Sequence, residues 1–175
     1  MDLDLVLNIN LDLSTAIKLY SFYIESLSYQ SRYILIGNSD YKYLMFNTLN
    51  PNPLNLRDYC LRLDKYLSLS PSCFIYAICI LDRCLENKLF IVKTVNELKI
   101  TLTILLLSAK MLEDDVYINK YWARLGGIYT ASMNKYEKYI LEGIDYRIHF
   151  TMLEYRNKFY KLRIMYLKKL GCYYR

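Results

Sequence analysis

Ten consecutive uncharged residues, Ile100–Ala109, lie between two lysines near the middle of the chain. Leucine and isoleucine dominate the stretch, so a helix formed here is apolar on nearly every side. Such a helix is stable in water only when other elements surround it. It is also well below the roughly 18–20 residues that a membrane-spanning helix needs. The sequence therefore predicts a buried central helix, at about 94–114, rather than a membrane span.

The rest of the chain carries the spacing of amphipathic helices. Only five Gly and three Pro interrupt the 175 residues, and apolar residues after Leu13 recur mostly at intervals of three and four, the period of α-helices. Ser14 and Ser70 are the expected N-caps of the first and third helices, and Gly126 or Gly127 is expected to end the fifth. The predicted fold class is all-α, with further helices at about 14–30, 56–67, 70–88, 119–125, 130–144 and 151–169.

The N-terminal residues follow a different period. Apolar residues occupy every odd position from Leu3 to Leu13, which is the alternation of a β-strand. Two interpretations stay open: an exposed strand that pairs with a partner, or a poorly ordered tail. The start is acidic and lacks the basic segment and cleavage site of a secretory signal. We therefore expect an intracellular protein, in the cytoplasm, the nucleus or both.

The composition fits one folded domain, with 54% hydrophobic and 23% charged residues. The net charge of +6 is uneven, because residues 147–175 hold eight Lys or Arg and one Glu. A basic C-terminal helix is typical of contact with nucleic acid or an acidic partner, or simply of a solvated surface. We favour the solvated surface and do not expect nucleic acid as a partner.

No arrangement typical of an enzyme is found. The sequence has no phosphate-binding loop and no H-E-x-x-H or G-x-S-x-G motif. His149 is the only histidine, and the five cysteines have no C-x-x-C spacing. The acidic run Glu113–Asp115 lacks the spaced oxygen ligands of a metal site, so we interpret it as a solvated helix end. We expect no enzymatic activity, cofactor, metal or small-molecule ligand.

Three charged residues fall on apolar helix faces when the helices are projected at 100° per residue. A buried carboxylate at Asp82 needs a cation, and Arg62 or Arg57 in the preceding helix is the nearest in sequence. We expect a structural ion pair between Asp82 and Arg62. Lys110 and Glu137 either pair with each other in the core or lie at the edge of their faces and bind the backbone of a partner. Periodicity alone favours the core pair.

Several motifs occur in an order that resembles the cyclin box of P-type (PHO-type) cyclins. They are "DYCLRLDKY", "SPSCFIYAICILDR", "SAKMLEDD", "YINKYWARLGGI" and "YEKYILEGIDYRI". The resemblance covers about residues 54–160. It implies an N-terminal extension with a helix at 1–53, a single cyclin box at 54–150 and a basic C-terminal helix at 151–175. The arginine-led opening of the mitotic cyclin box is absent, and no second box is visible.

The resemblance also implies a fold and a function. The fold is the five-helix cyclin fold with additional N-terminal and C-terminal helices and with 94–114 at its centre. The function is that of a regulatory subunit, inactive alone, that binds and activates a cyclin-dependent protein kinase. The alternative is a cyclin-fold transcription or scaffold protein that binds nucleic acid or another protein. The positions that match kinase-binding residues of cyclins are Lys110, Met111, Glu137, Leu141, Tyr146 and Ile148.

Overall fold

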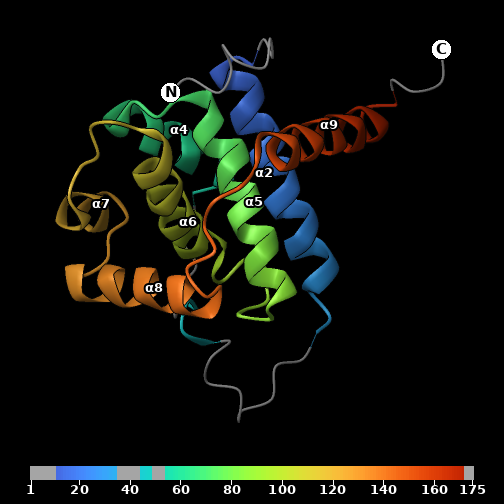
Figure 1. The fold of residues 1–175 in the computed structure, drawn as a ribbon. Coiled ribbons are helices and arrows are strands. Elements are labelled where there is room, and N and C mark those ends of the chain that lie inside the picture. The colour runs from blue at the N-terminus through green and yellow to red at the C-terminus, as the bar shows by residue number, and fades with distance from the viewer. Residues whose placement is uncertain (1–10, 35–43, 49–53, 172–175) are drawn as a thin grey trace.

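The computed structural model describes residues 11–34, 44–48 and 54–171 (Figure 1). In these residues the chain forms seven α-helices and no strand, which confirms the all-α prediction. Most of the alternating N-terminal segment lies outside the described residues, as do Pro51, Pro53 and Cys172. The helices are α2 (Leu13–Ser31), α4 (Leu56–Leu67), α5 (Pro71–Glu86), α6 (Glu97–Leu112), α7 (Asn119–Leu125), α8 (Thr130–Gly143) and α9 (Met152–Lys169).

Helix α6 is the central element, with α4, α5, α7 and α8 packed against it (Figure 1). Every residue of Ile100–Ala109 is buried, as the uncharged run predicts. The polar groups inside this run are satisfied: Thr101 Oγ1 accepts from Tyr20 Oη at 3.1 Å, and Ser108 Oγ donates to the Cys73 carbonyl at 2.7 Å. A buried polar group is tolerated when it is hydrogen-bonded in this way.

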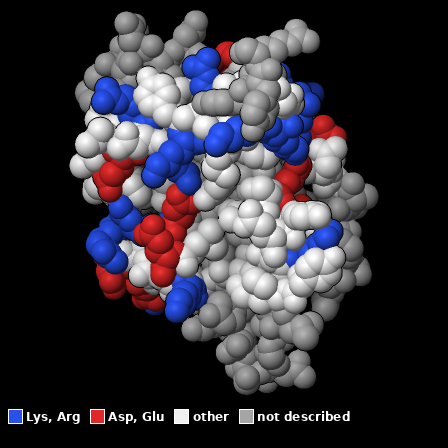
Figure 2. Space-filling view, turned by 90° about the vertical axis from the view of Figure 1, so that its right-hand side faces the viewer, with Lys and Arg blue, Asp and Glu red and all other residues white. Residues whose placement is uncertain are grey.

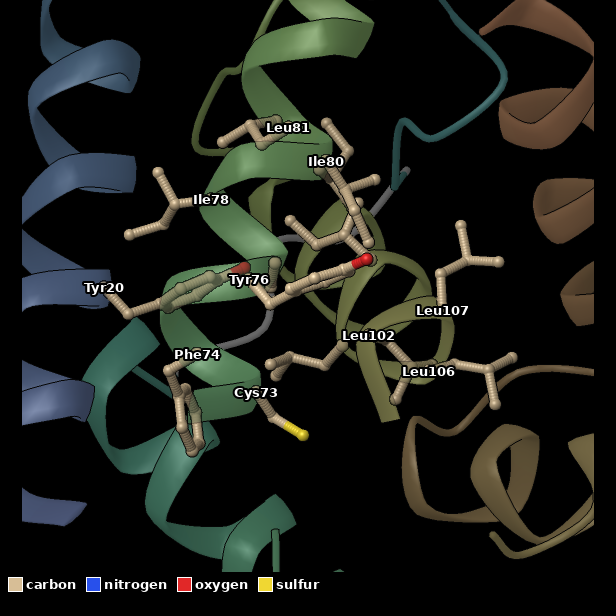
Figure 3. Packing of buried hydrophobic residues seen from close by; sticks show 14 of the residues in the cluster. Tyr20, Cys73, Phe74, Tyr76, Ile78, Ile80, Leu81, Leu102, Leu106 and Leu107 are labelled. Atoms are coloured by element: carbon tan, nitrogen blue, oxygen red, sulfur yellow. The ribbon is translucent and has the colours of Figure 1, made fainter. Parts of the chain in front are cut away.

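The core around α6 is built mainly with side chains of α5. Tyr76 and Ile80 of α5 point toward α6, whose buried residues include Leu102 and Leu106 (Figure 3). All four residues are buried. Tyr76 Oη donates a 2.9 Å hydrogen bond to the Ile148 carbonyl, which ties the segment after α8 to the core. The five helices α4 to α8, with α2 and α9 outside them, match the arrangement that the resemblance implies.

Two helix starts show how local chemistry sets the boundaries. The expected cap at Ser14 is wrong, because α2 begins after Asp12, whose carboxylate accepts from Thr15 N at 2.9 Å and from Thr15 Oγ1 at 2.6 Å. The expected N-cap position of Ser70 is confirmed, with Pro71 next to it. The Ser70 hydroxyl makes no capping bond, and its backbone N–H donates to Glu113 Oε1 at 2.9 Å instead.

The turn between α7 and α8 depends on two glycines for different reasons. Gly127 has φ +66°, a left-handed conformation that favours glycine. Gly126 has an ordinary φ, but a Cβ added there would lie 2.1 Å from Cδ2 of the buried Leu102. The close approach of this turn to α6 accompanies the packing of both α7 and α8 against the central helix.

The predicted ion pair between Asp82 and Arg62 is wrong. Asp82 of α5 pairs with Lys158 of α9 and also accepts a 2.6 Å hydrogen bond from Tyr23 Oη of α2. Arg62 is exposed on α4. The difference arises from tertiary packing, because α9 packs over α5 and α2. The cation that pairs with Asp82 therefore comes from 76 residues further along the chain. The carboxylate does have a cation, as its place on an apolar face requires.

Candidate partner-binding site

Lys110 and Glu137 form an ion pair at the surface where α6 and α8 meet. Lys110 Nζ lies 2.6 Å from Glu137 Oε1, and the two side chains are 36% and 16% exposed. The two charges pair with each other, as one of the two expectations had it. Their location at the edge of the apolar faces, and not within the core, agrees with the second expectation, which was a position open to a partner.

The positions of both side chains follow from the local structure. Lys110 stands in the last turn of α6, just beyond the buried run that ends at Ala109. Glu137 is further held by Asn119, the first residue of α7, whose Nδ2 donates to Glu137 Oε2 at 2.6 Å and to Asn134 Oδ1 at 2.9 Å. Asn119 was missed in the sequence, because an amide at a helix start has many ordinary explanations. The pair is thus fixed by three helices.

The pair retains hydrogen-bonding capacity. An ammonium group has three donors and each carboxylate oxygen has two lone pairs. Within the described residues, Lys110 makes one hydrogen bond and each oxygen of Glu137 accepts one. A fixed donor and a fixed acceptor therefore lie side by side at the surface. That combination suits the carbonyl and N–H groups of a peptide backbone, such as those left free at a helix end.

The four apolar residues expected to contact a kinase together with the pair differ in exposure. Met111 and Leu141 are partly exposed, and Tyr146 is 63% exposed. Tyr146 and the preceding Asp145 both have positive φ, at 55° and 53°, which turns the chain sharply after α8. Ile148 differs from the expectation, because it is only 8% exposed and belongs to the core. Its side chain offers little surface to a partner.

Comparison with known proteins identifies the family. The family model described as Cyclin matches residues 16–148, which include most of α2 and all of α4 to α8. The chain belongs to the cyclin family. The match begins within α2, earlier than the cyclin box predicted from the motifs. Cyclins are regulatory proteins rather than enzymes, so this cyclin is a member of a family of regulators.

Relatives of this cyclin include U-type and P-type cyclins. Cyclin-U3-1 of Arabidopsis thaliana is 31% identical over 115 residues, 66% of this chain and 52% of the relative. Cyclin-U4-2 of the same plant is 34% identical over 113 residues, 64% and 52%. Cyclin-P3-1 of Oryza sativa subsp. japonica is 32% identical over 95 residues, 54% and 40%. The P-type resemblance is confirmed. The chain spans about half the length of the curated relatives it matches.

Among the described residues, two cysteines illustrate the state of the other titratable groups of the cyclin. Burial raises the pKa of Cys79 and of Cys84 to about 12, so both are protonated thiols at neutral pH. In the described part of the chain, no group of three or more His, Cys, Asp or Glu side chains is placed to hold a metal ion. No helix among the described ones has the length and apolar content to cross a membrane.

Glu97, the first residue of α6, makes the stability of the cyclin depend on pH. Burial raises its pKa from 4.5 to about 7, and the nearby Glu25 carboxylate adds to the shift. Because the folded state binds this proton more tightly, the stabilisation is complete below about pH 4.5 and is lost as the pH rises through 7. After a discount for solvent screening we expect Glu97→Gln to raise the free energy of unfolding by about 1 kcal/mol at pH 8.

Urea denaturation at pH 8 and at pH 5 measures this effect. At pH 5 the gain from Glu97→Gln should be clearly smaller than at pH 8, because Glu97 is then protonated in the folded state and only the unfolded carboxyl, whose pKa is 4.5, is largely ionised. Glu142→Gln, on the exposed surface of α8, is the control and should show no such difference between the two pH values. An equal gain for Glu97→Gln at both pH values would contradict the assignment.

Proposed function

We propose that this cyclin binds and activates a cyclin-dependent protein kinase. The observation that carries the proposal is the ion pair of Lys110 and Glu137 at the surface, together with the exposed or partly exposed side chains of Met111, Leu141 and Tyr146. Cyclins bind their kinase through residues that match these positions. The docking surface is formed by Lys110, Met111, Glu137, Leu141 and Tyr146.

The charges and the apolar residues have different tasks in this proposal. Apolar anchors supply most of the affinity of a protein interface, while charged groups fix its register. Met111 and Leu141 pack on the mobile helix of the kinase. Lys110 donates to backbone carbonyls and Glu137 accepts from backbone N–H groups. Since their geometry is already fixed by α6, α7 and α8, little side-chain entropy is lost on binding.

Activation follows as a shift of population. A protein kinase is active only when its catalytic Lys–Glu ion pair is assembled, and the position of the mobile helix controls this pair. A partner that binds only the arrangement with the helix in place favours that arrangement by its differential affinity. The cyclin contributes no reacting group, which agrees with a sequence that lacks catalytic motifs.

A charge exchange separates docking from stability. Lys110→Ala and Glu137→Ala should each lower the free energy of unfolding by about 1 kcal/mol or less, because the pair is partly exposed. Capture of the kinase should fall about tenfold or more, which corresponds to about 1.4 kcal/mol or more. The double variant Lys110→Glu with Glu137→Lys restores an ion pair but not the hydrogen bond from Asn119, so it should recover part of the lost stability. It should not restore kinase capture, because donor and acceptor now face the wrong backbone groups.

The measurement is affinity capture from extract of cells that make the protein, followed by mass spectrometry and a kinase assay of the captured material. The matched control is Lys138→Glu with Glu142→Lys, which exchanges an exposed ion pair on another face of α8. We expect the control to capture kinase as the unmodified chain does. Equal capture and activity by the exchanged Lys110–Glu137 variant would sink the proposal.

A further inference from the structure

Helix α9 has two apolar faces. The inner face packs on the core, with Tyr155, Phe159 and Leu162 at most 3% exposed. On the opposite side of the same helix, Leu153, Tyr160 and Ile164 are 57%, 47% and 40% exposed. Exposed apolar residues are normal when they are scattered. These are not scattered, because a projection at 100° per residue gathers them in one stripe.

The outer stripe has the spacing of a coiled-coil seam. Leu153, Tyr160 and Leu167 are seven residues apart, and Ile164 lies between the last two. In a heptad register, Leu153, Tyr160 and Leu167 occupy successive d positions. The a positions between them are Asn157 and Ile164. None of the four apolar residues belongs to the core, although Leu167 is partly buried and the ring of Tyr160 lies 5.7 Å from that of the core residue Phe159. The stripe spans about 60° of the helix, the narrow width typical of a helix–helix seam.

Basic residues border the seam on both sides. Arg156 and Arg163 occupy g positions, and Lys161 and Lys168 occupy e positions. In the described residues, Arg156, Lys161 and Arg163 form no ion pair. Lys and Arg gather in the upper half of the face shown in Figure 2, where α9 lies. The side chains next to the seam are therefore positive, which determines what can bind there.

The one acidic residue at an e position does not change this balance. Glu154 is held by the start of its own helix, because Oε2 accepts from Thr151 N at 2.6 Å and from Thr151 Oγ1 at 2.8 Å. Glu154 Oε1 also lies 3.6 Å from Arg83 Nη2. Its charge is thus directed to the N-terminus of α9 and to α5, away from a partner on the seam.

We propose that the outer face of α9 binds an acidic amphipathic helix of another protein. Opposite charges at e and g positions select partner and orientation in coiled coils, and like charges oppose pairing. A second copy of α9 would place basic residues against basic residues. An anionic membrane suits a basic helix, but membrane-surface helices bury a broad apolar face, and here the broad face is already packed on the core. A helix with apolar a and d residues and acidic e and g residues fits both features.

This surface is separate from the proposed kinase-docking surface. The seam lies on α9, which packs on α5 and α2, whereas Lys110 and Glu137 lie on α6 and α8. The two surfaces share no residue. The inference therefore does not rest on the proposed kinase function.

A designed peptide tests the seam on the full chain. The probe is a helix of about three heptads with Leu at a and d and Glu at e and g, and the control probe carries Lys in place of Glu. We expect the acidic probe to bind in a fluorescence anisotropy titration and the basic probe not to bind. Lys161→Glu with Arg163→Glu should weaken the acidic probe at least about tenfold, because two attractions become repulsions. Higher salt should weaken it too.

A charge-reversal control away from α9, a vesicle-binding measurement and a sedimentation measurement distinguish the proposal from its alternatives. Lys120→Glu with Lys135→Glu changes the same charge on exposed positions of α7 and α8 and should leave probe binding unchanged. Absence of binding, or equal binding of both probes, would overturn the proposal. So would binding to phosphatidylserine vesicles without peptide binding, or sedimentation as a dimer that Ile164→Asp makes monomeric. Kinase capture by the Lys161→Glu, Arg163→Glu variant should be normal.

Discussion

Truncation of Leu106 to alanine lowers the free energy of unfolding by about 3–5 kcal/mol. Leu106 is fully buried in α6, on the side of that helix turned away from α5 (Figure 3). Helices surround α6, so little of the lost volume can be filled by relaxation, and the variant loses both transfer free energy and packing contacts. Since a domain of this size is stable by about 5–15 kcal/mol in total, the loss is large.

Urea denaturation followed by circular dichroism measures the change. The midpoint should fall while the slope stays constant, which marks a change of stability without a change of unfolding mode. Leu61→Ala is the matched control, because Leu61 is 44% exposed on α4, and it should change stability by less than about 0.5 kcal/mol. A loss below about 1 kcal/mol for Leu106→Ala would mean that α6 is not enclosed as the structure has it.

The helices could be predicted because the pattern of apolar residues along a helix determines which of its faces is buried. Amphipathic helices such as α4 bury every third or fourth residue, and the predicted bounds 56–67 agree with the structure. Helix α6 has no such period. It was predicted from the length of its uncharged run, because a helix apolar on all sides has to be enclosed. Both inferences need only the sequence of the helix itself.

The partners of charged residues could not be predicted in the same way. The apolar face around Asp82 showed that a cation was needed, but sequence distance gave Arg62 where packing gives Lys158. Periodicity also showed Lys110 and Glu137 on apolar faces without showing how exposed they are. Their exposure depends on where α6 leaves the core and how the turn before α8 places that helix. These are properties of the tertiary arrangement.

Replacement of Lys158 by methionine destabilises the fold by about 2 kcal/mol. Lys158 and Asp82 are only 16% and 29% exposed in their side chains, so the variant leaves a half-buried carboxylate with one remaining partner, Tyr23 Oη at 2.6 Å. Loss of one partner of a fully buried pair is worth about 3–5 kcal/mol. Partial exposure lets water compensate for some of it. Burial, then the hydrogen bond to Asp82, raises the pKa of Tyr23 well above its usual value, so Tyr23 remains a donor.

A multiple variant shows whether the effect arises from an unpaired charge or from lost packing. Asp82→Leu and Tyr23→Phe, added to Lys158→Met, remove the carboxylate and the hydroxyl that would otherwise lack partners. Replacement of a whole buried polar network by apolar groups of similar size is often close to neutral. We therefore expect the triple variant to be more stable than Lys158→Met alone. If its loss in urea denaturation instead equals the sum of the three single losses, the contact of α9 with α5 and α2 rests on packing and not on this ion pair.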